Sequence, residues 1–359
     1  MEALDQAIDA LFGVGGALAG VDGRYEPRPQ QAAMGRAVAE TLENGQILVV
    51  EAGTGVGKSL GYLLPAALWA VANGRRVIVS TYTRALQEQI LDKELPAAAR
   101  ALAALGHTLR YAMLQGSDNY LCVQRLSRLR EPGGFFEETH DGLLGELSAW
   151  ARTAVTGHRA KLPRLVPQTV WSRLSRDPDL CLGASGPYWQ SCLYRKDKER
   201  ADRAHIVVVN HALLLSGARL PAYDALIIDE AHSLEDSAVG HFGVSVSAGR
   251  VARLAEDMRP LLPHFPSLAE PVSRGAAEVA AFLEDAARAH GWKGRGEEPG
   301  GKLLDEKAGL AEPPGLRALD LEFQHIFAQR QTAATGEKAD ETVMELRLAH
   351  TRLTALRSE

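Results

Sequence analysis

The chain has 359 residues, of which 46% are hydrophobic and 24% charged, so it can bury a large core and form two or three domains. The formal net charge of −5 excludes a global positive field for nucleic acid, although a local basic stripe is compatible with it. The three cysteines, an odd number, argue against a disulfide framework and favour free thiols or metal ligands.

The sequence shows no membrane segment and no secretion signal. There is no apolar run of 18 residues, and the first five residues (Met-Glu-Ala-Leu-Asp) lack the basic start of a signal peptide. We therefore expect a soluble, cytoplasmic protein without a membrane partner.

The apolar patterns predict an α/β domain. Along the first part of the chain they predict a helix at 32–42, a buried strand at 47–50, a helix at 58–73, a buried strand at 77–81, a helix at 83–104 and a third strand at 109–114. Strand patterns return at 206–210 and 225–229. Apolar runs without alternation are typical of central strands in a parallel sheet that is covered on both faces.

The segment between these two groups of strands has a different character. Residues 115–204 look irregular and contain all three cysteines, so we interpret them as an insertion into one α/β domain. That domain then comprises residues 1–114 and 205–240. Residues 241–359 are mostly helical and charged in pattern, and form a third part.

A glycine-rich segment directly follows the predicted strand 47–50. It consists of Gly53, Thr54, Gly55, Val56, Gly57, Lys58 and Ser59. Glycines let backbone N–H groups turn around an anion, and the following helix directs its positive dipole end at that anion. Lys58 would reach the β- and γ-phosphates of ATP, and the Ser59 hydroxyl would bind Mg²⁺. The first glycine of the usual pattern is Ala52 here, and an ordinary glycine-rich turn is the alternative interpretation.

A second motif, Asp229-Glu230-Ala231-His232, lies at the end of the last predicted strand. Open α/β sheets bind their ligands at this end. Asp229 would hold Mg²⁺ through water, and Glu230 would polarise the water that attacks the γ-phosphate. A plain helix N-cap is the alternative, but the phosphate loop upstream favours the catalytic interpretation.

The order of these motifs resembles superfamily 2 helicases, and more narrowly the DinG/XPD family of iron–sulfur DNA helicases. The matching segments are residues 25–31, 51–59, 80–87, 116–122, 209–214 and 229–232. The resemblance implies a RecA-like motor domain with an iron–sulfur-type insertion at 115–204 and a helical arch at 241–359. It also implies ATP-dependent, 5′→3′ unwinding of single-stranded or forked DNA in repair or replication.

The resemblance further implies roles for individual residues. Gln31, with Arg28, would contact adenine, and His232 would couple the nucleotide state to DNA. Three residues would lie near the DNA backbone: Thr81, Thr83 and Arg84. Polar residues after a strand are also common turn formers, and a purely structural role for His232 is the alternative.

The family's insertion holds a [4Fe–4S] cluster with four cysteines. Cys122 and Cys181 match the first two places and Cys192 the last, whereas the third place is Gly186. Cubane clusters use four thiolates. The sequence therefore leaves open a cluster with another ligand, a cluster that lacks an iron, or structural thiols without a cluster.

The insertion is locally basic. Residues 151–205 hold eleven Lys or Arg and five acids, a difference of 11 − 5 = +6, and aromatic residues lie among them (Trp171, Tyr188, Trp189 and Tyr194). Basic and aromatic side chains together are typical of a single-strand DNA surface. A solvated face with its aromatics in a small core is the alternative.

No second set of buried strands follows residue 240, so we expect this chain to be the N-terminal half of a helicase whose second RecA domain is missing. Such a half would bind ATP and Mg²⁺ and hold single-stranded DNA weakly, with slow hydrolysis and no unwinding. The competing hypotheses are a non-catalytic nucleotide- and DNA-binding module, and a P-loop ATPase unrelated to DNA.

Overall fold

A computed structural model describes residues 2–21, 23, 25–53, 55–130, 141–178 and 181–242 of the N-terminal part. Of the C-terminal part it describes residues 254–255, 258–259, 262–289, 314–330, 346, 349–350 and 353–354. The chain divides into two compact units, Met1–Gly243 and Val244–Glu359. We describe each unit by itself.

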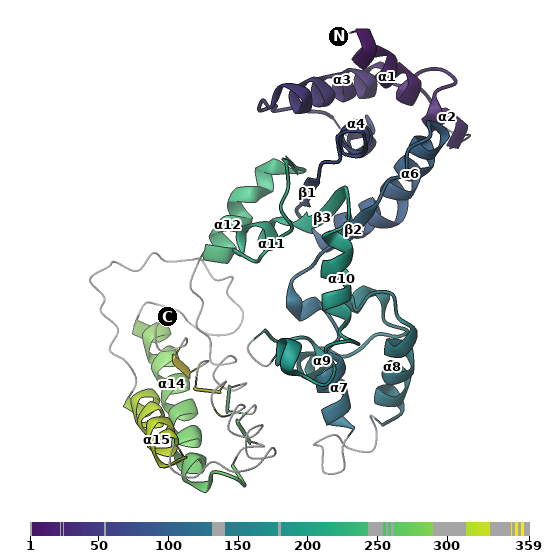
Figure 1. Cartoon of the computed structure of the whole chain (residues 1–359). Helices are drawn as coiled ribbons and strands as arrows, with labels where there is room; N and C mark the ends of the chain where they lie inside the picture. The colour runs from purple at the N-terminus through teal and green to yellow at the C-terminus, as the bar shows by residue number, and fades with distance from the viewer. Residues whose placement is uncertain are drawn as a thin grey trace. The chain divides into compact units, whose positions relative to one another are not determined.

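The first unit is built on a parallel sheet (Figure 1). In its described part the strand order is β2-β3-β1-β4, with β1 at Val77–Thr81, β2 at Tyr111–Met113, β3 at Ile206–Asn210 and β4 at Ala225–Ile228. Residue Val77 of β1 lies in register with the first residues of both neighbours, Ile206 and Ala225. The predicted α/β class and these strands are confirmed.

Successive strand residues pack into two different cores, as the period of a β-strand requires. On one face, Val77, Val79, Ile206 and Val208 pack with helices α1 (Glu2–Phe12), α3 (Pro29–Asn44), α4 (Lys58–Asn73) and α6 (Leu95–Ala104). On the other face, Ile78, Val207 and Val209 pack with residues of α10 (Leu193–Ala201) and α11 (His211–Leu215). The central strands are therefore covered on both sides.

The helices of this unit begin and end close to the predicted positions. Helix α3 ends at Gly45 and α4 ends at Gly74, both with left-handed backbone (φ 63°), where glycine carries no steric penalty. The predicted helix 83–104 is not continuous. It consists of α5 (Arg84–Gln89), a wider π-helical turn (Ile90–Glu94) and α6. Helix α2 (Ala17–Val21) packs against α6.

The predicted buried strand at 47–50 is wrong in this structure. These residues form no ladder with any described strand, and Ile47 and Val49 are 95% and 92% exposed. An extended segment becomes a strand only when a neighbour supplies hydrogen bonds. Strand β4 pairs with β1 alone among the described strands, and Leu226 within it is 38% exposed.

The insertion is more regular than its sequence suggests. It contains α7 (Val123–Leu129), α8 (Asp141–Thr153), α9 (Gln168–Leu174) and α10, and it has its own core around Leu126, Leu144 and Trp171. Helix α10 leads back into the sheet at β3, and α11 and α12 (Leu234–Phe242) complete the unit. The predicted domain boundaries at 114, 204 and 240 stay predictions.

The second unit is helical in its described part. Helices α14 (Ala269–Ala289) and α15 (Pro314–Arg330) pack together around Phe323 and Val279. Its identification as an arch domain stays a prediction. None of the described helices in either unit combines the length and apolar character that a membrane span requires.

Leu63 tests how far α4 supports the first unit, because this side chain is fully buried in the core between α4 and the sheet. We expect Leu63→Ala to lower the free energy of unfolding by about 2–5 kcal/mol through lost burial and a residual cavity. Urea denaturation measures this change. Val14→Ala, at a side chain that is 95% exposed, is the control and should change little. Equal effects of the two substitutions would contradict the packing described above.

Candidate nucleotide-binding site

The glycine-rich loop has the backbone geometry of an anion site. Gly55 and Gly57 adopt left-handed conformations (φ 80° and 79°), and α4 begins at Lys58 directly after Gly57. A Cβ atom at position 57 would collide with the Gln31 amide, so this position needs glycine for two reasons. Thr54 lies outside the described residues.

Two residues predicted to contact adenine hold the loop itself. The Gln31 amide donates to the carbonyl of Gly57 (Nε2–O 2.8 Å), and the Arg28 guanidinium donates to the carbonyl of Gly55. Gln31 is buried, and its Oε1 accepts a hydrogen bond from the Tyr25 hydroxyl at 2.9 Å. These bonds fix the backbone of the loop. The adenine contact stays a prediction.

The acidic motif meets the loop across the sheet edge. The ammonium of Lys58 lies 3.4 Å from Oε1 of Glu230, and both side chains are about one-third exposed. Glu230 has φ 54°, and no other non-glycine residue among those described has a positive φ. Such a conformation costs about 1–3 kcal/mol and often marks a functional position. His232 lies 3.6 Å from the other Glu230 oxygen and is 78% exposed.

The sequence analysis missed two residues that interact with Asp229 and Ser59, namely Tyr62 and Glu94. Burial raises the pKa of Asp229, and the Glu230 carboxylate raises it further. Burial raises the pKa of Tyr62, and the charge of Asp229 raises it further. The Tyr62 hydroxyl has no hydrogen-bond partner among the described residues. Burial also raises the pKa of Glu94, while Gln89 and Ser59 partly offset this effect.

These shifts follow mainly from burial and from the closeness of the carboxyl groups to one another. Buried carboxyl groups close to one another resist ionisation, and a divalent ion beside them would reverse this effect. Mg²⁺ commonly takes one or two protein oxygens together with phosphate oxygens and water, and Ser59 and Asp229 fit that use. The position of Tyr62, four residues after Lys58 on α4, could have been anticipated from helix geometry. Glu94 carries no comparable signal.

The strand ends beside this site are joined by a buried pair. Ser80 Oγ lies 2.7 Å from Nδ1 of His211, and the Ser80 carbonyl accepts from the N–H of Asp229 at 2.8 Å. Burial lowers the pKa of His211. Ser80 and His211 therefore connect β1 with α11, the helix after β3, and the Ser80 carbonyl connects β1 with the acidic motif. Neither contact adds a charge to the site.

The three residues predicted near DNA differ in accessibility. Thr81 is fully buried, and its hydroxyl has no partner within the described structure. Thr83 caps α5, because its Oγ1 accepts from the N–H of Leu86 at 3.2 Å. Arg84 is exposed and donates to Asn119 at 2.7 Å, so of the three it presents the most accessible donor. DNA contact by these residues stays a prediction.

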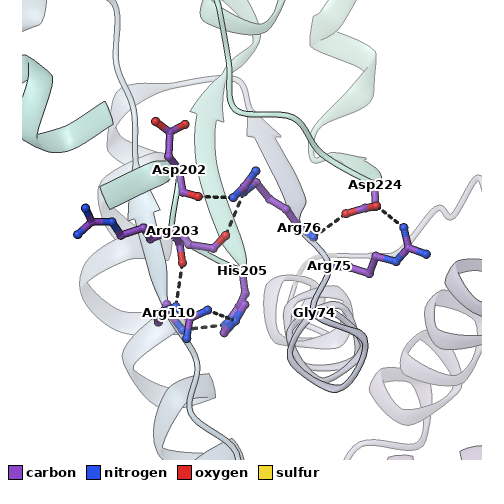
Figure 2. A pocket seen from close by; sticks show the side chains of 9 residues that line it. Gly74, Arg75, Arg76, Arg110, Asp202, Arg203, His205 and Asp224 are labelled. Carbon is purple, nitrogen blue, oxygen red and sulfur yellow. Dashed lines mark hydrogen bonds and ion pairs between the residues drawn. The ribbon is translucent and has the colours of Figure 1, made fainter. Parts of the chain in front are cut away.

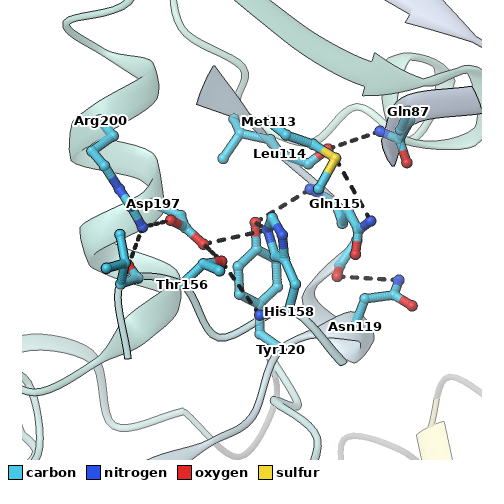
Figure 3. Close-up of polar contacts among 12 residues, drawn as sticks. Gln87, Met113, Leu114, Gln115, Asn119, Tyr120, Thr156, His158, Asp197 and Arg200 are labelled. Atoms are coloured by element: carbon cyan, nitrogen blue, oxygen red, sulfur yellow. Dashed lines mark hydrogen bonds and ion pairs between the residues drawn. The ribbon is translucent and has the colours of Figure 1, made fainter. Parts of the chain in front are cut away.

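A buried polar network joins the sheet to the insertion (Figure 3). The Tyr120 hydroxyl accepts from the N–H of Gln115, at the end of β2, and lies 2.9 Å from Nε2 of His158. The same Nε2 lies 3.3 Å from Asp197 on α10, which also bonds to Thr156 and Arg200. Three separate segments are thus held at one point.

Comparison with known proteins identifies the family. A DEAD/DEAH box helicase model matches residues 29–126. The ATP-dependent DNA helicase YoaA of Escherichia coli is 36% identical over 69% of this chain, and the ATP-dependent helicase DinG of Mycobacterium tuberculosis is 34% identical over 72%. The chain belongs to the DinG/XPD family of ATP-dependent helicases.

The chain spans about two-fifths of the length of these relatives, 39% of YoaA and 42% of DinG. A solved XPD helicase structure aligns with 92% of this chain and 51% of its own length, with a TM-score of 0.46 and 14% identity.

The insertion of this DinG/XPD-family chain does not fit a four-thiolate cluster. Cys122, Cys181 and Cys192 are all half-buried free thiols, and the remaining place of the motif, the third, is Gly186. Within the described residues, no group of three or more His, Cys, Asp or Glu side chains is arranged to hold a metal ion. Burial raises the pKa of the Cys122 thiol.

Several aromatic residues of the insertion are used within the protein. Trp171 is buried in the core of the insertion and donates its Nε1–H to the Asp118 carbonyl at 2.9 Å. Arg159 stacks on Trp171 at 5.1 Å, and Arg176 stacks on Tyr194 at 4.2 Å. For Trp171 the alternative of a small aromatic core is confirmed, whereas DNA binding by the basic face stays a prediction.

The polar network predicts a loss of stability in mild acid. Burial, with the nearby Arg200 and Lys161, lowers the pKa of His158 from 6.5 to about 4, and the Asp197 charge is already engaged by Arg200. The unfolded ring binds a proton near pH 6.5 and the folded ring only near 4, so stability is full above this window and falls as pH falls through it. The expected loss in the free energy of unfolding approaches about 3 kcal/mol.

Urea denaturation between pH 7 and pH 4 measures this loss. His158→Gln should remove much of the pH dependence, whereas His107→Gln, in the loop before β2, should retain it. An unchanged pH profile for His158→Gln would contradict the assignment.

Gly186 predicts the iron content of the chain. A Cβ atom there would lie 3.0 Å from the Leu182 Cβ and would be otherwise unobstructed, so a cysteine fits after a small shift. We expect well below about four irons per chain in the natural protein and an increase for Gly186→Cys, measured by iron and sulfide assay after anaerobic purification. Ser185→Cys adds a thiol at the exposed neighbouring residue and should bind no more iron than the natural protein. A full cluster in the natural chain would show that another ligand replaces residue 186.

Proposed function

We propose that this chain is the nucleotide-binding half of an ATP-dependent DNA helicase that moves 5′→3′ along single-stranded or forked DNA in repair or replication. The observation that carries the proposal is the approach of Lys58 to Glu230, 3.4 Å apart at the mouth of the phosphate loop. The names of the relatives, ATP-dependent helicase DinG and ATP-dependent DNA helicase YoaA, support the reaction.

The proposed residues divide the work on ATP. The loop N–H groups and Lys58 bind and orient the phosphates, and Arg28 and Gln31 hold the loop and contact the base. Ser59 and Asp229 would hold Mg²⁺, which would neutralise charge on the phosphates. Glu230 then accepts a proton from the attacking water, and its ion pair with Lys58 opens as the phosphate takes the ammonium.

The exposed segment 47–50 and the half-exposed β4 support a role within a longer protein. Ile47 and Val49 place apolar side chains in water directly before the loop, which a partner strand would cover. A RecA-like motor also needs a second domain to supply arginines at the transition state. We therefore propose that these residues, without such a second domain, bind ATP, hold single-stranded DNA weakly, hydrolyse ATP slowly and do not unwind a duplex.

A non-catalytic binding module is the second candidate, and Gly186 in the cluster place is the observation that favours it. The intact Lys58, Asp229 and Glu230 favour the enzyme. Coding sequence for a second RecA domain downstream of this chain would decide for the helicase.

Two substitutions separate binding from hydrolysis. We expect Lys58→Ala to weaken binding of a fluorescent ATP analogue at least about tenfold, because one charge-assisted phosphate contact is lost. Glu230→Gln should bind the analogue almost normally yet lower the slow phosphate release further, since its amide cannot take a proton. Lys93→Ala, at an exposed residue of the π-helical turn, is the control. Hydrolysis that survives Lys58→Ala would refute the assigned site.

A further inference from the structure

A pocket lies at the edge of the sheet where the strands begin, opposite the candidate nucleotide site (Figure 2). It has a volume of about 430 Å³. Arg76 directly precedes β1, Arg110 precedes β2, His205 precedes β3 and Asp224 precedes β4. Parallel pairing therefore brings together residues from four distant parts of the chain, and none of them belongs to the nucleotide site.

The pocket is positively charged although the chain is not. It is lined by four arginines (Arg75, Arg76, Arg110 and Arg203) and two acids (Asp202 and Asp224), a balance of 4 − 2 = +2 in a chain whose net charge is −5. One of the acids is already engaged. The Asp224 carboxylate accepts from Arg75 at 2.6 Å and from the backbone N–H of Arg76 at 2.9 Å, and these bonds lower its pKa.

The arginine charges are only partly compensated. The Arg76 guanidinium donates to the backbone carbonyls of Ala204, Ala222 and Asp202, which are neutral and leave its charge uncancelled. Arg110 donates from Nε to the Arg203 carbonyl at 2.8 Å. The Nη1 group of Arg110 has no partner within the described part of the chain.

His205 shows that an acceptor is missing. Arg110 directs hydrogen-bond donors at both ring nitrogens of His205. Its backbone N–H lies 3.2 Å from Nδ1, and its Nη2 lies 2.7 Å from Nε2. A neutral imidazole accepts at one nitrogen only, so one of these donors lacks an acceptor. Burial lowers the pKa of His205, and the charges of Arg110 and Arg76 lower it further. A bound anion would supply the acceptor and offset the positive field.

We propose that this pocket binds a phosphoryl group, at a site separate from the phosphate loop and independent of ATP hydrolysis. Guanidinium groups recognise carboxylate and phosphate alike. A phosphoryl group is favoured here because Arg75 and Arg76 enter from the start of β1 and Arg110 from the start of β2, and its tetrahedral oxygens can meet donors from several directions. The source is a phosphate of a nucleic-acid backbone or a free phosphate anion.

Calorimetric titration with inorganic pyrophosphate tests the pocket on the full chain carrying Lys58→Ala, so that the phosphate loop does not compete. Adding Arg75→Gln and Arg110→Gln should weaken binding at least about tenfold, since two charge-assisted contacts are lost. Arg100→Gln with Arg219→Gln makes the same charge change at exposed residues outside the pocket and should leave the affinity within about twofold. Equal weakening in both double variants, or in neither, would overturn the proposal.

A substitution that is expected to strengthen binding separates the loss of a contact from the misfolding of a variant. Asp202 lines the pocket and is exposed, and its carboxylate makes no hydrogen bond or ion pair with the residues that the structure describes. Asp202→Asn raises the local balance from +2 to +3 and should tighten pyrophosphate binding a few-fold, about 0.5–1 kcal/mol in the exposed-charge range. Unchanged or weaker binding in Asp202→Asn would count against the site.

A DNA titration distinguishes the two sources. Fluorescence anisotropy with labelled oligothymidylate, at several salt concentrations, should show lower affinity and a salt slope smaller by about one unit in Arg75→Gln/Arg110→Gln if a backbone phosphate occupies the pocket. Unchanged DNA binding with weakened pyrophosphate binding would assign a free phosphate anion. An acidic glutamate peptide that displaces pyrophosphate at lower concentration would overturn the phosphoryl assignment. Binding of the ATP analogue to the pocket variant with intact Lys58 reports separately on the phosphate loop.

Discussion

The parallel pairing of β1 with β3 and β4 is the constraint on which the rest of this structure depends. Strands that run in the same direction end at one edge and begin at the other. Because Val77 is in register with Ile206 and Ala225, the residues after β1, β3 and β4 converge at the nucleotide site. The residues before these strands converge equally at the opposite edge and form the basic pocket. The same strand register thus places an acidic motif at one edge of the sheet and an arginine-rich pocket at the other.

The nucleotide site is held together by its own charges. Lys58 pairs with Glu230, while the more buried Asp229 and Glu94 have raised pKa values. ATP and Mg²⁺ would complement this arrangement, since the phosphates can replace Glu230 as the partner of the ammonium and the metal can stabilise the buried carboxylates. The strained backbone of Glu230 holds this side chain toward the loop before any ligand arrives.

A buried polar network attaches the insertion to the sheet. Tyr120, His158 and Asp197 come from three segments and meet in a buried place, where hydrogen bonds are worth more and unsatisfied groups cost more than at the surface. Nδ1 of His158 has no partner there. A proton on that nitrogen would be buried without an acceptor, which is the physical reason why acid should loosen this junction.

The sequence by itself determined what consecutive residues encode. Apolar runs predicted β1, β3 and β4, and the motifs around Lys58 and Asp229 predicted the chemistry and the family, because periodicity and motif spacing are local. Only the tertiary structure decided what depends on distant neighbours. It left 47–50 without a partner strand, placed Glu94 beside Ser59, and joined Arg76, Arg110 and His205 in one pocket. Pairing and burial arise between segments that are distant in the sequence, such as β1 and β3, and no local pattern contains that information.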